Sequence, residues 1–138
     1  MQAVVDAPAA NAPPPAAKFS NALLLGERLV LSGMHAGDGK GGVAGDGTPY
    51  DQARVAFERI RALVEAAGGV MDDIVLLRVY LTQIEHKADM GRARAAFFSA
   101  PYPCSTLVQV SGLVDPGLVV EVEAEALLGS SAPPKENP

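Results

Sequence analysis

Three glutamates, Glu121, Glu123 and Glu125, alternate with Val122 and Ala124 near the end of the chain. Period-two spacing places all three carboxylates on one face of one strand, about 6–7 Å apart along it. Glutamate is not a favoured strand residue, so the pattern needs a reason. The face is either a solvated surface or the lining of a site, where burial and neighbouring like charges would raise a carboxylate pKa toward the range of acid/base catalysis.

His35 and Arg78 are the other residues that could carry chemistry. His35 follows a predicted strand, on the side expected for Leu29 and Leu31. It is either a strand-end histidine with satisfied hydrogen bonds or a residue that moves protons near neutral pH. Arg78 interrupts an otherwise apolar strand. Its stem can pack while its head reaches water, or the guanidinium can hold an anion.

The glycine-rich segment GDGKGG, residues 37–42, resembles a phosphate-binding loop but lacks its defining residues. Lys40 is followed by Gly41 where such a loop has serine or threonine, and no helix begins directly after it. A calcium loop is excluded because Pro49 stands where the twelfth-position glutamate would be. We expect a mobile hairpin loop, with a lid over a site as the alternative.

No cofactor or metal is predicted. His35, His86 and Cys104 are the only soft metal ligands, and they share no ligand spacing. Cys104 could be a nucleophile, but no histidine or basic residue precedes it in a known pattern, and a small, semi-buried thiol is the simpler interpretation.

Composition limits the class of protein. The 138 residues fit one domain, and 49% of them are apolar, enough for a core. A net charge of −5 and a pI of about 4.9 argue against binding nucleic acid through phosphate neutralisation. A single cysteine rules out an intrachain disulfide, and no apolar run could span a membrane. The N-terminus lacks signal-peptide features, so we expect a cytoplasmic protein.

The chain divides into a core and two ends. Seven of the eleven prolines lie near the termini, which predicts flexible Ala/Pro-rich tails at residues 1–17 and 129–138 around a folded domain at 18–128.

Within the domain, strands and helices alternate. Residues 22–33 predict two strands joined at Gly26-Glu27. A helix begins after Thr48, a predicted N-cap, and ends at Gly68-Gly69. The next elements are a strand at 73–81, a helix at 87–100, and strands at 105–110 and 118–127. The order β-β-α-β-α-β-β predicts an α+β fold with the helices on one face of a mixed sheet.

Five segments in register resemble the YjgF/RidA family of enamine/imine deaminases. They are LGERLVLSGM (25–34), YDQARVAFERIRALVEAAGG (50–69), MDDIVLLRVYLT (71–82), RARAAFF (92–98) and PCSTLVQVSGL with VVEVEAEA (103–126). The resemblance implies a chorismate-mutase-like fold and a homotrimer whose sheets form a central barrel. It also implies a small-molecule pocket at each subunit interface, where reactive 2-imino acids and their enamine tautomers are hydrolysed to keto acids and ammonia.

The resemblance assigns roles at this pocket. Glu121 corresponds to the glutamate that positions water, and Ser32 to a serine that lines the pocket. Four other positions depart from the family pattern: Ser105 replaces the arginine that holds the substrate carboxylate, Leu107 replaces a cysteine, and Phe19 replaces a tyrosine. An asparagine often found in the second helix of the family aligns near Gly91. The chain therefore resembles a branch without the arginine, and we expect a ligand less anionic and more apolar than a small 2-imino acid.

An enamine, imine or related C–N or carbonyl compound is the predicted substrate of a hydrolase. Glu121 would act as base, His35 as proton shuttle and, if its side chain reaches the pocket, Arg78 as replacement anchor. Two alternatives stay open: a non-catalytic trimeric module that binds a small molecule, and a pathway-specific cyclising or isomerising enzyme that uses the same glutamate. The acidic charge argues against ribonuclease activity.

Overall fold

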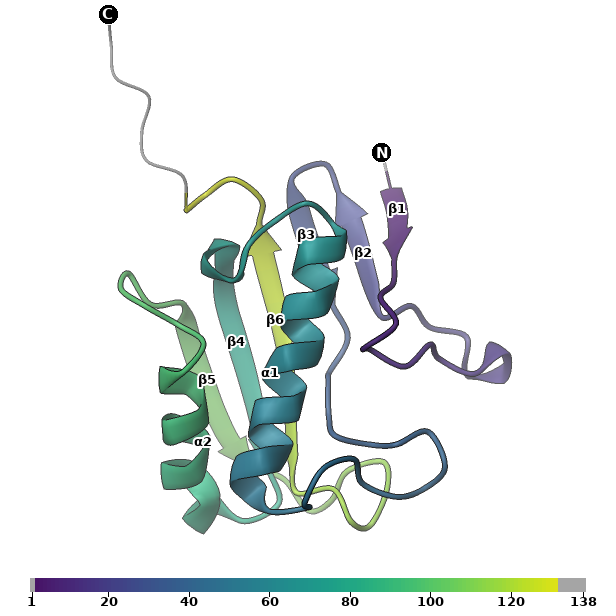
Figure 1. Cartoon of the computed structure of the whole chain (residues 1–138), viewed down its shortest axis with the longest axis vertical. Helices are drawn as coiled ribbons and strands as arrows, with labels where there is room; N and C mark the ends of the chain where they lie inside the picture. Colours follow the sequence, from purple (N-terminus) through teal and green to yellow (C-terminus); the bar gives the residue numbers. More distant parts are fainter. Residues whose placement is uncertain (1, 132–138) are drawn as a thin grey trace, which may run out of the picture.

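A computed structural model describes residues 2–131 (Figure 1), which form one mixed sheet with two helices across one of its faces. The sheet has six strands in the order β1-β2-β3-β6-β4-β5. The strands are β1 (Gln2–Val5), β2 (Ala22–Leu25), β3 (Arg28–Leu31), β4 (Ile74–Leu81), β5 (Cys104–Gln109) and β6 (Val120–Leu127). The helices are α1 (Pro49–Ala66) and α2 (Lys87–Ala95), with short 3₁₀ turns at Pro15–Ala17, Met71–Asp73 and Ile84–His86.

The sheet is mixed because only one pair of strands is parallel. β4 and β5 run parallel, joined by a crossover through α2, and every other neighbouring pair is antiparallel. Both helices lie on the same face (Figure 1). This confirms the predicted α+β class with helices on one side of a mixed sheet.

The core fills the space between the helices and the sheet. Phe57, Ile60 and Leu63 recur at three- and four-residue spacing along α1 and are fully buried. From the sheet, Val120 and Val122 alternate toward them along β6 and are buried as well. The opposite face of the sheet carries no helix, so half of each central strand is left without an intrachain covering layer.

The N-terminal prediction needs correction. Residues 1–17 were expected to form a flexible tail, but Gln2–Val5 is strand β1, paired with β2 from Gln2–Leu25 to Val5–Ala22. The order of elements therefore has one strand more than predicted. At the other end, the backbone N–H of Ser131 donates to the buried Asp73 carboxylate at 3.1 Å. The rest of the predicted C-terminal tail lies outside the described residues.

The second helix is shorter than predicted. α2 ends at Ala95, not near Ala100, because Pro101 and Pro103 follow within two turns and cannot continue a helix. The released residues Phe97 and Phe98 turn back onto Phe57, with ring centroids 5.4 and 5.5 Å from it. Among residues 2–131, no helix is both long and apolar enough to cross a membrane.

A one-residue irregularity lies just after β3 and decides which side chains face the helices. Val30 pairs with Glu125, whereas Met34 pairs with Val122, so four steps along one strand match three along the other. Such an extra residue inverts the alternation of side chains beyond it. Met34 is accordingly buried in the core, and the expectation that His35 shares a side with Leu31 is wrong.

Candidate functional site

Glu121 lies on the face of the sheet that no helix covers and rests against the backbone of Gly33. A Cβ built on Gly33 would come within 2.1 Å of Glu121 Oε2, so only glycine leaves room for this carboxylate. Burial, followed by the neighbouring Glu123 charge, raises the pKa of Glu121 above its ordinary value. A half-buried carboxylate with a raised pKa is a stronger base than an exposed one and can accept and return a proton.

His35 is held in its neutral form by its surroundings. Its Nδ1 accepts a hydrogen bond from the Gly37 backbone N–H at 2.9 Å, which leaves the ring proton on Nε2. Burial and the nearby Arg59 lower the pKa of His35, and Asp115 partly opposes them. At neutral pH the imidazole is therefore a hydrogen-bond donor through Nε2 and not a store of an acidic proton.

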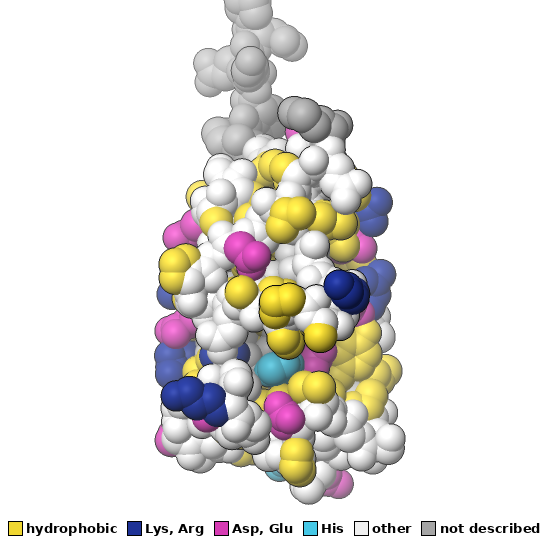
Figure 2. Space-filling view, turned by 90° about the vertical axis from the view of Figure 1, so that its right-hand side faces the viewer, with side chains coloured by type: hydrophobic (Ala, Val, Ile, Leu, Met, Phe, Trp, Pro, Cys, Tyr) yellow, Lys and Arg dark blue, Asp and Glu magenta, His cyan; other side chains and the backbone are white. Residues whose placement is uncertain are grey.

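A cavity of about 160 Å³ opens beside His35. Gly33, Arg59, Asp115 and Phe19 also line it, together with the N-terminal segment around Pro13 and Pro14. Figure 2 shows this side of the molecule, where a histidine side chain lies in a hollow among acidic, basic and apolar groups. Gly33 both contacts Glu121 and lines the cavity, so the carboxylate and the cavity are neighbours.

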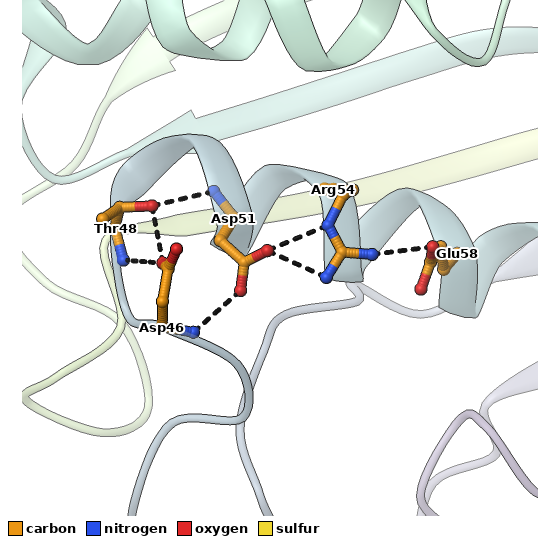
Figure 3. Close-up of polar contacts among 5 residues, drawn as sticks. All are labelled: Asp46, Thr48, Asp51, Arg54 and Glu58. Atoms are coloured by element: carbon orange, nitrogen blue, oxygen red, sulfur yellow. Dashed lines mark hydrogen bonds and ion pairs between the residues drawn. The ribbon is translucent and has the colours of Figure 1, made fainter.

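The start of α1 fixes the helix that carries Arg59. Thr48 Oγ1 accepts from the Asp51 backbone N–H at 3.2 Å, as the sequence predicted, and Asp46 accepts from Thr48 in turn (Figure 3). Asp51 then pairs with Arg54, which reaches Glu58 one turn further on (Figure 3).

Buried Gln52 ties α1 to the turn that carries Asp115. Its amide donates to the carbonyls of Gly47 and Gly117 at 3.0 and 3.1 Å and accepts from the Val119 N–H at 2.9 Å. Its amide group thus has three backbone partners on two segments, and the turn is held against the helix.

Buried Asn21 holds the N-terminal segment over the cavity. Its amide lies within hydrogen-bond distance of Asp6 Oδ1 and of the carbonyls of Ala10 and Asn11, at 2.9, 3.2 and 2.9 Å. Asn11 in turn donates to the Gly37 carbonyl at 3.2 Å. These bonds hold residues 6–14 in place, and residues 11–14 form a wall of the cavity, although the sequence predicted a flexible tail there.

Two residues that the resemblance assigns to the pocket, Phe19 and Ser32, lie close to the cavity and to Gly33. Phe19 is 55% exposed and lines the cavity with its ring. Ser32 lies beside Gly33, but its hydroxyl donates to the Ser20 carbonyl at 2.7 Å and its backbone N–H donates to Asn21. Ser32 therefore fixes the backbone next to Gly33 and does not line the cavity.

Arg78 belongs to a charged row on the uncovered face, away from the cavity. Its guanidinium lies 3.9 Å from Glu123 and 3.8 Å from Glu125, and Glu125 also pairs with Arg28 at 3.1 Å. The Tyr80 hydroxyl donates to Glu123, which together with burial raises the pKa of Tyr80. Glu123 and Glu125 are thus neutralised by neighbours, and Glu121 is left without a cation partner among residues 2–131.

Ser105 and Leu107 lie on edge strand β5, separated from Glu121 by β4. They pair with Leu77 and Val79, whose side chains point into the core, so both lie on the helix side of the sheet. Ser105 is exposed, and Leu107 packs against the core. Within one protomer the structure does not bring them to Glu121.

The site therefore gathers Glu121, His35 and Phe19 and adds Arg59 and Asp115, which sequence reasoning missed. Arg59 occupies a polar position of an amphipathic helix, where a charged residue is ordinary. Asp115 precedes the Pro116-Gly117 turn, which likewise gave no sign of a site. Among residues 2–131, no three histidine, cysteine or acidic side chains cluster as a metal ion would need.

Comparisons with known proteins agree on one family. The endoribonuclease L-PSP family model matches residues 9–128. A RutC family protein of Pyrococcus horikoshii is 34% identical over 116 residues, which cover 84% of this chain and 91% of that protein.

Solved structures are similar over nearly the whole chain. A protein of unknown function from Pseudomonas aeruginosa has 43% identity and a TM-score of 0.83, and the match covers 94% of each chain. RidA from the Antarctic bacterium Psychrobacter sp. has 33% identity and a TM-score of 0.75, covering 85% of this chain and 94% of that one. E. coli TdcF with bound serine has 27% identity and a TM-score of 0.80, covering 91% and 98%.

Proposed function

The chain belongs to the YjgF/RidA family, and from that premise we propose that it is a deaminase-like hydrolase of small imines or enamines. Its six-stranded mixed sheet with two helices is the chorismate-mutase-like α+β fold of that family. The observation that carries the proposal is Glu121, a half-buried carboxylate with a raised pKa, held against the bare backbone of Gly33 beside a cavity.

The proposed reaction needs one base and one water. Glu121 takes a proton from water as its oxygen attacks the imine carbon, and the C=N bond becomes a C–N single bond in a carbinolamine. Glu121 gives this proton to the nitrogen, which completes the carbinolamine. Glu121 then takes the proton of the carbinolamine hydroxyl and passes it to the nitrogen as the C–N bond breaks and the C=O bond forms, so ammonia and a carbonyl compound leave. In this scheme His35 donates a hydrogen bond from Nε2, because its neutral form has no acidic proton to shuttle.

We further propose that the protein works as a homotrimer with the reaction site between protomers. Strand β5 is a sheet edge, and the face that carries Glu121 has no helix over it. In this arrangement a neighbouring protomer approaches with its β5 edge and brings its own Ser105 and Leu107, which lie on the helix side of that edge, toward Glu121. Family membership supports the arrangement.

Imine hydrolysis by the purified protein tests the proposal. A threonine dehydratase would generate 2-iminobutyrate in situ, and keto-acid release would be followed against trapping of the imine by semicarbazide. Wild type should accelerate release, and Glu121→Gln should lose roughly 10²–10⁴-fold in rate. Glu125→Gln, on the same strand face but paired with Arg28 and Arg78, is the matched control and should retain the rate. Full activity of Glu121→Gln would remove the assigned base.

A non-catalytic trimeric module that binds a small molecule is the second candidate. The exposed hydroxyl of Ser105 at the position of the family's carboxylate-holding arginine favours it, because a site without that arginine can retain a ligand pocket and lose the reaction. Saturable binding by wild type without product would support this function. Activity gained by Ser105→Arg would show that the catalytic residues are intact and that the natural ligand is less anionic.

A further inference from the structure

Arg94 is a half-buried cation on α2 whose side chain has no partner. Its Nε is enclosed by protein without a hydrogen-bond acceptor, and within residues 2–131 its guanidinium joins no ion pair. Burial lowers the pKa of Arg94, so its surroundings disfavour the charge. Arg92 on the same helix differs, because it pairs with Asp89 at 2.6 Å and lies over the Tyr50 ring. An anion beside Arg94 would offset the cost of its buried charge.

Arg94 lines a cavity of about 360 Å³ where the end of α2 meets the segment that leads into β5 (Figure 1). Phe98, Tyr102 and Pro103 give this cavity aromatic and apolar walls. Gly91 leaves its helix side open, since a Cβ on Gly91 would meet no atom within 4 Å. Ligand pockets in proteins measure about 300–1,000 Å³, so this cavity has room for a small molecule.

The cavity at Arg94 is separate from the one beside His35. The helices cover one face of the sheet, and Phe98 packs on that side against Phe57 of α1, with ring centroids 5.5 Å apart. Glu121 lies on the opposite face, and the two cavities share no lining residue. A molecule bound at Arg94 would therefore lie across the sheet from Glu121 of the same protomer, and its binding does not depend on the hydrolysis proposed above.

The charge and the walls define the kind of ligand. One guanidinium balances one negative charge, and its planar fork matches a carboxylate, which two N–H groups can hold at once. A phosphate dianion would leave a second charge without a partner. A cavity of about 150 Å³ holds a benzene-sized molecule, so one of about 360 Å³ has room for two fused rings. The rings of Phe98 and Tyr102 favour such a flat, apolar body.

We infer that this cavity is a binding site for a bicyclic aromatic carboxylate, with the carboxylate on the terminal nitrogens of Arg94 and the ring system against Phe98, Tyr102 and Pro103. The ligand carries no ammonium group, because no acidic side chain from the described part of the chain lines the cavity. Every contact comes from one chain, so the site needs no neighbouring protomer.

Calorimetric titration of the full chain with three matched probes tests the site. 2-Naphthoate carries the ring system and the charge, benzoate carries the charge on a single ring, and 2-naphthylmethylamine carries the ring system with the opposite charge. 2-Naphthoate should bind most tightly, and the amine should not bind. Arg94→Gln should weaken 2-naphthoate by tenfold or more. Gly91→Leu should abolish its binding, because the new side chain fills the cavity while leucine favours the helix more than glycine does.

Control variants separate this site from folding and from the other cavity. Arg92→Gln removes an exposed, paired cation from the same helix and should bind 2-naphthoate like wild type. Glu121→Gln should also bind it like wild type, since Glu121 lies on the other face of the sheet. If Arg94→Gln is unfolded by circular dichroism, Gly91→Leu decides on its own.

Four results would overturn the inference. They are a wild type that does not bind 2-naphthoate, an Arg94→Gln that binds it as Arg92→Gln does, a Gly91→Leu that binds it like wild type, and a loss of binding in Glu121→Gln. A lower molecular mass of Arg94→Gln in solution would assign Arg94 to a contact between protomers and would overturn it as well. Imine hydrolysis is measured separately, so a failure of this site and a failure of the proposed hydrolase can be told apart.

Discussion

At the scale of single residues, Glu121 combines a functional position with a cost in stability. Its pKa is raised in the folded state, so folding favours the protonated form. A carboxyl group with a raised pKa stabilises the fold fully only below its unfolded pKa, near 4.5, and loses that contribution as the pH rises through the folded pKa. At neutral pH the charged Glu121 is therefore less favourable than an uncharged side chain of the same shape.

Glu121→Gln should accordingly raise the melting temperature at pH 7 and lose this advantage at pH 4, where the wild-type carboxyl is protonated as well. Thermal unfolding across this pH range measures the difference. Glu125→Gln removes ion pairs with Arg28 and Arg78 and should be neutral or slightly destabilising at pH 7. Equal melting temperatures for wild type and Glu121→Gln at both pH values would contradict the raised pKa.

Gly33 has no Cβ, and the space this leaves is occupied by the Glu121 carboxylate. In Gly33→Ala the new methyl group would lie 2.1 Å from Glu121 Oε2, so the carboxylate must move. We expect imine hydrolysis to fall at least tenfold, because a base displaced by about 1 Å loses its geometry. Gly91→Ala in α2 is the control, since its Cβ meets open space and should stabilise the helix by about 0.5–1 kcal/mol. Steady-state rates and unfolding curves of both variants check the pair.

The candidate residues differ in how visible they are in the sequence. Glu121 could be proposed from the alternating glutamates and the family resemblance. Arg59 and Asp115 could not, because a charged residue on a helix or beside a turn is most often solvated, and only the three-dimensional structure shows that they share a cavity. The role of Ser32 also needed coordinates, since its hydrogen bond to Ser20 is not encoded in any spacing.

At the scale of elements, the N-terminal segment depends on one buried side chain. Asn21→Ala would remove the amide that joins Asp6, Ala10 and Asn11 and leave buried backbone acceptors unpaired. We expect a loss of about 1–3 kcal/mol in the free energy of unfolding and faster hydrogen exchange at residues 2–14. Asn11→Ala removes a single bond from an exposed residue and should cost less. Unchanged exchange in Asn21→Ala would mean that β1 pairing alone holds the segment.

Most elements could be predicted because each has a local signal. The cap at Thr48, the hairpin at Gly26-Glu27 and the alternation along β6 all act within a few residues. Strand β1 lacks such a signal, because four residues inside an Ala/Pro-rich stretch form a strand only through pairing with β2. The extra residue after β3 is equally invisible, since only the partner strand reveals it.

At the scale of the whole molecule, the uncovered sheet face is where the proposed trimer is tested. Val108 is 42% exposed and lies in one row with Tyr80 and Glu121 across that face. Val108→Arg should convert a species of three times the 14.2 kDa chain mass into monomer, because it places an unpaired charge in the interface. Val70→Arg, 53% exposed beyond the end of α1, should leave the mass unchanged.

Light scattering coupled to size exclusion measures the mass, and two outcomes bear on the proposed site between protomers. A wild-type monomer would contradict the site between protomers. A monomeric Val108→Arg that no longer hydrolyses imine would support a reaction site between chains. The sequence could not show whether water or a neighbouring protomer covers this face, because the residue pattern of an edge strand and an open sheet face is the same in both cases.

The extra residue after β3 has a consequence for insertions and deletions during evolution. Because it inverts the side-chain alternation between Val30 and Met34, removing any one residue from 31–33 would restore regular pairing with β6. Val30 would still pair with Glu125 and Met34 with Val122, but the backbone that leaves room for the Glu121 carboxylate at Gly33 would follow a different path. Substitutions in this stretch alter one side chain each, whereas a single-codon deletion changes the backbone next to Glu121. We therefore expect the length of this segment to be under stronger selection than the identity of most of its residues.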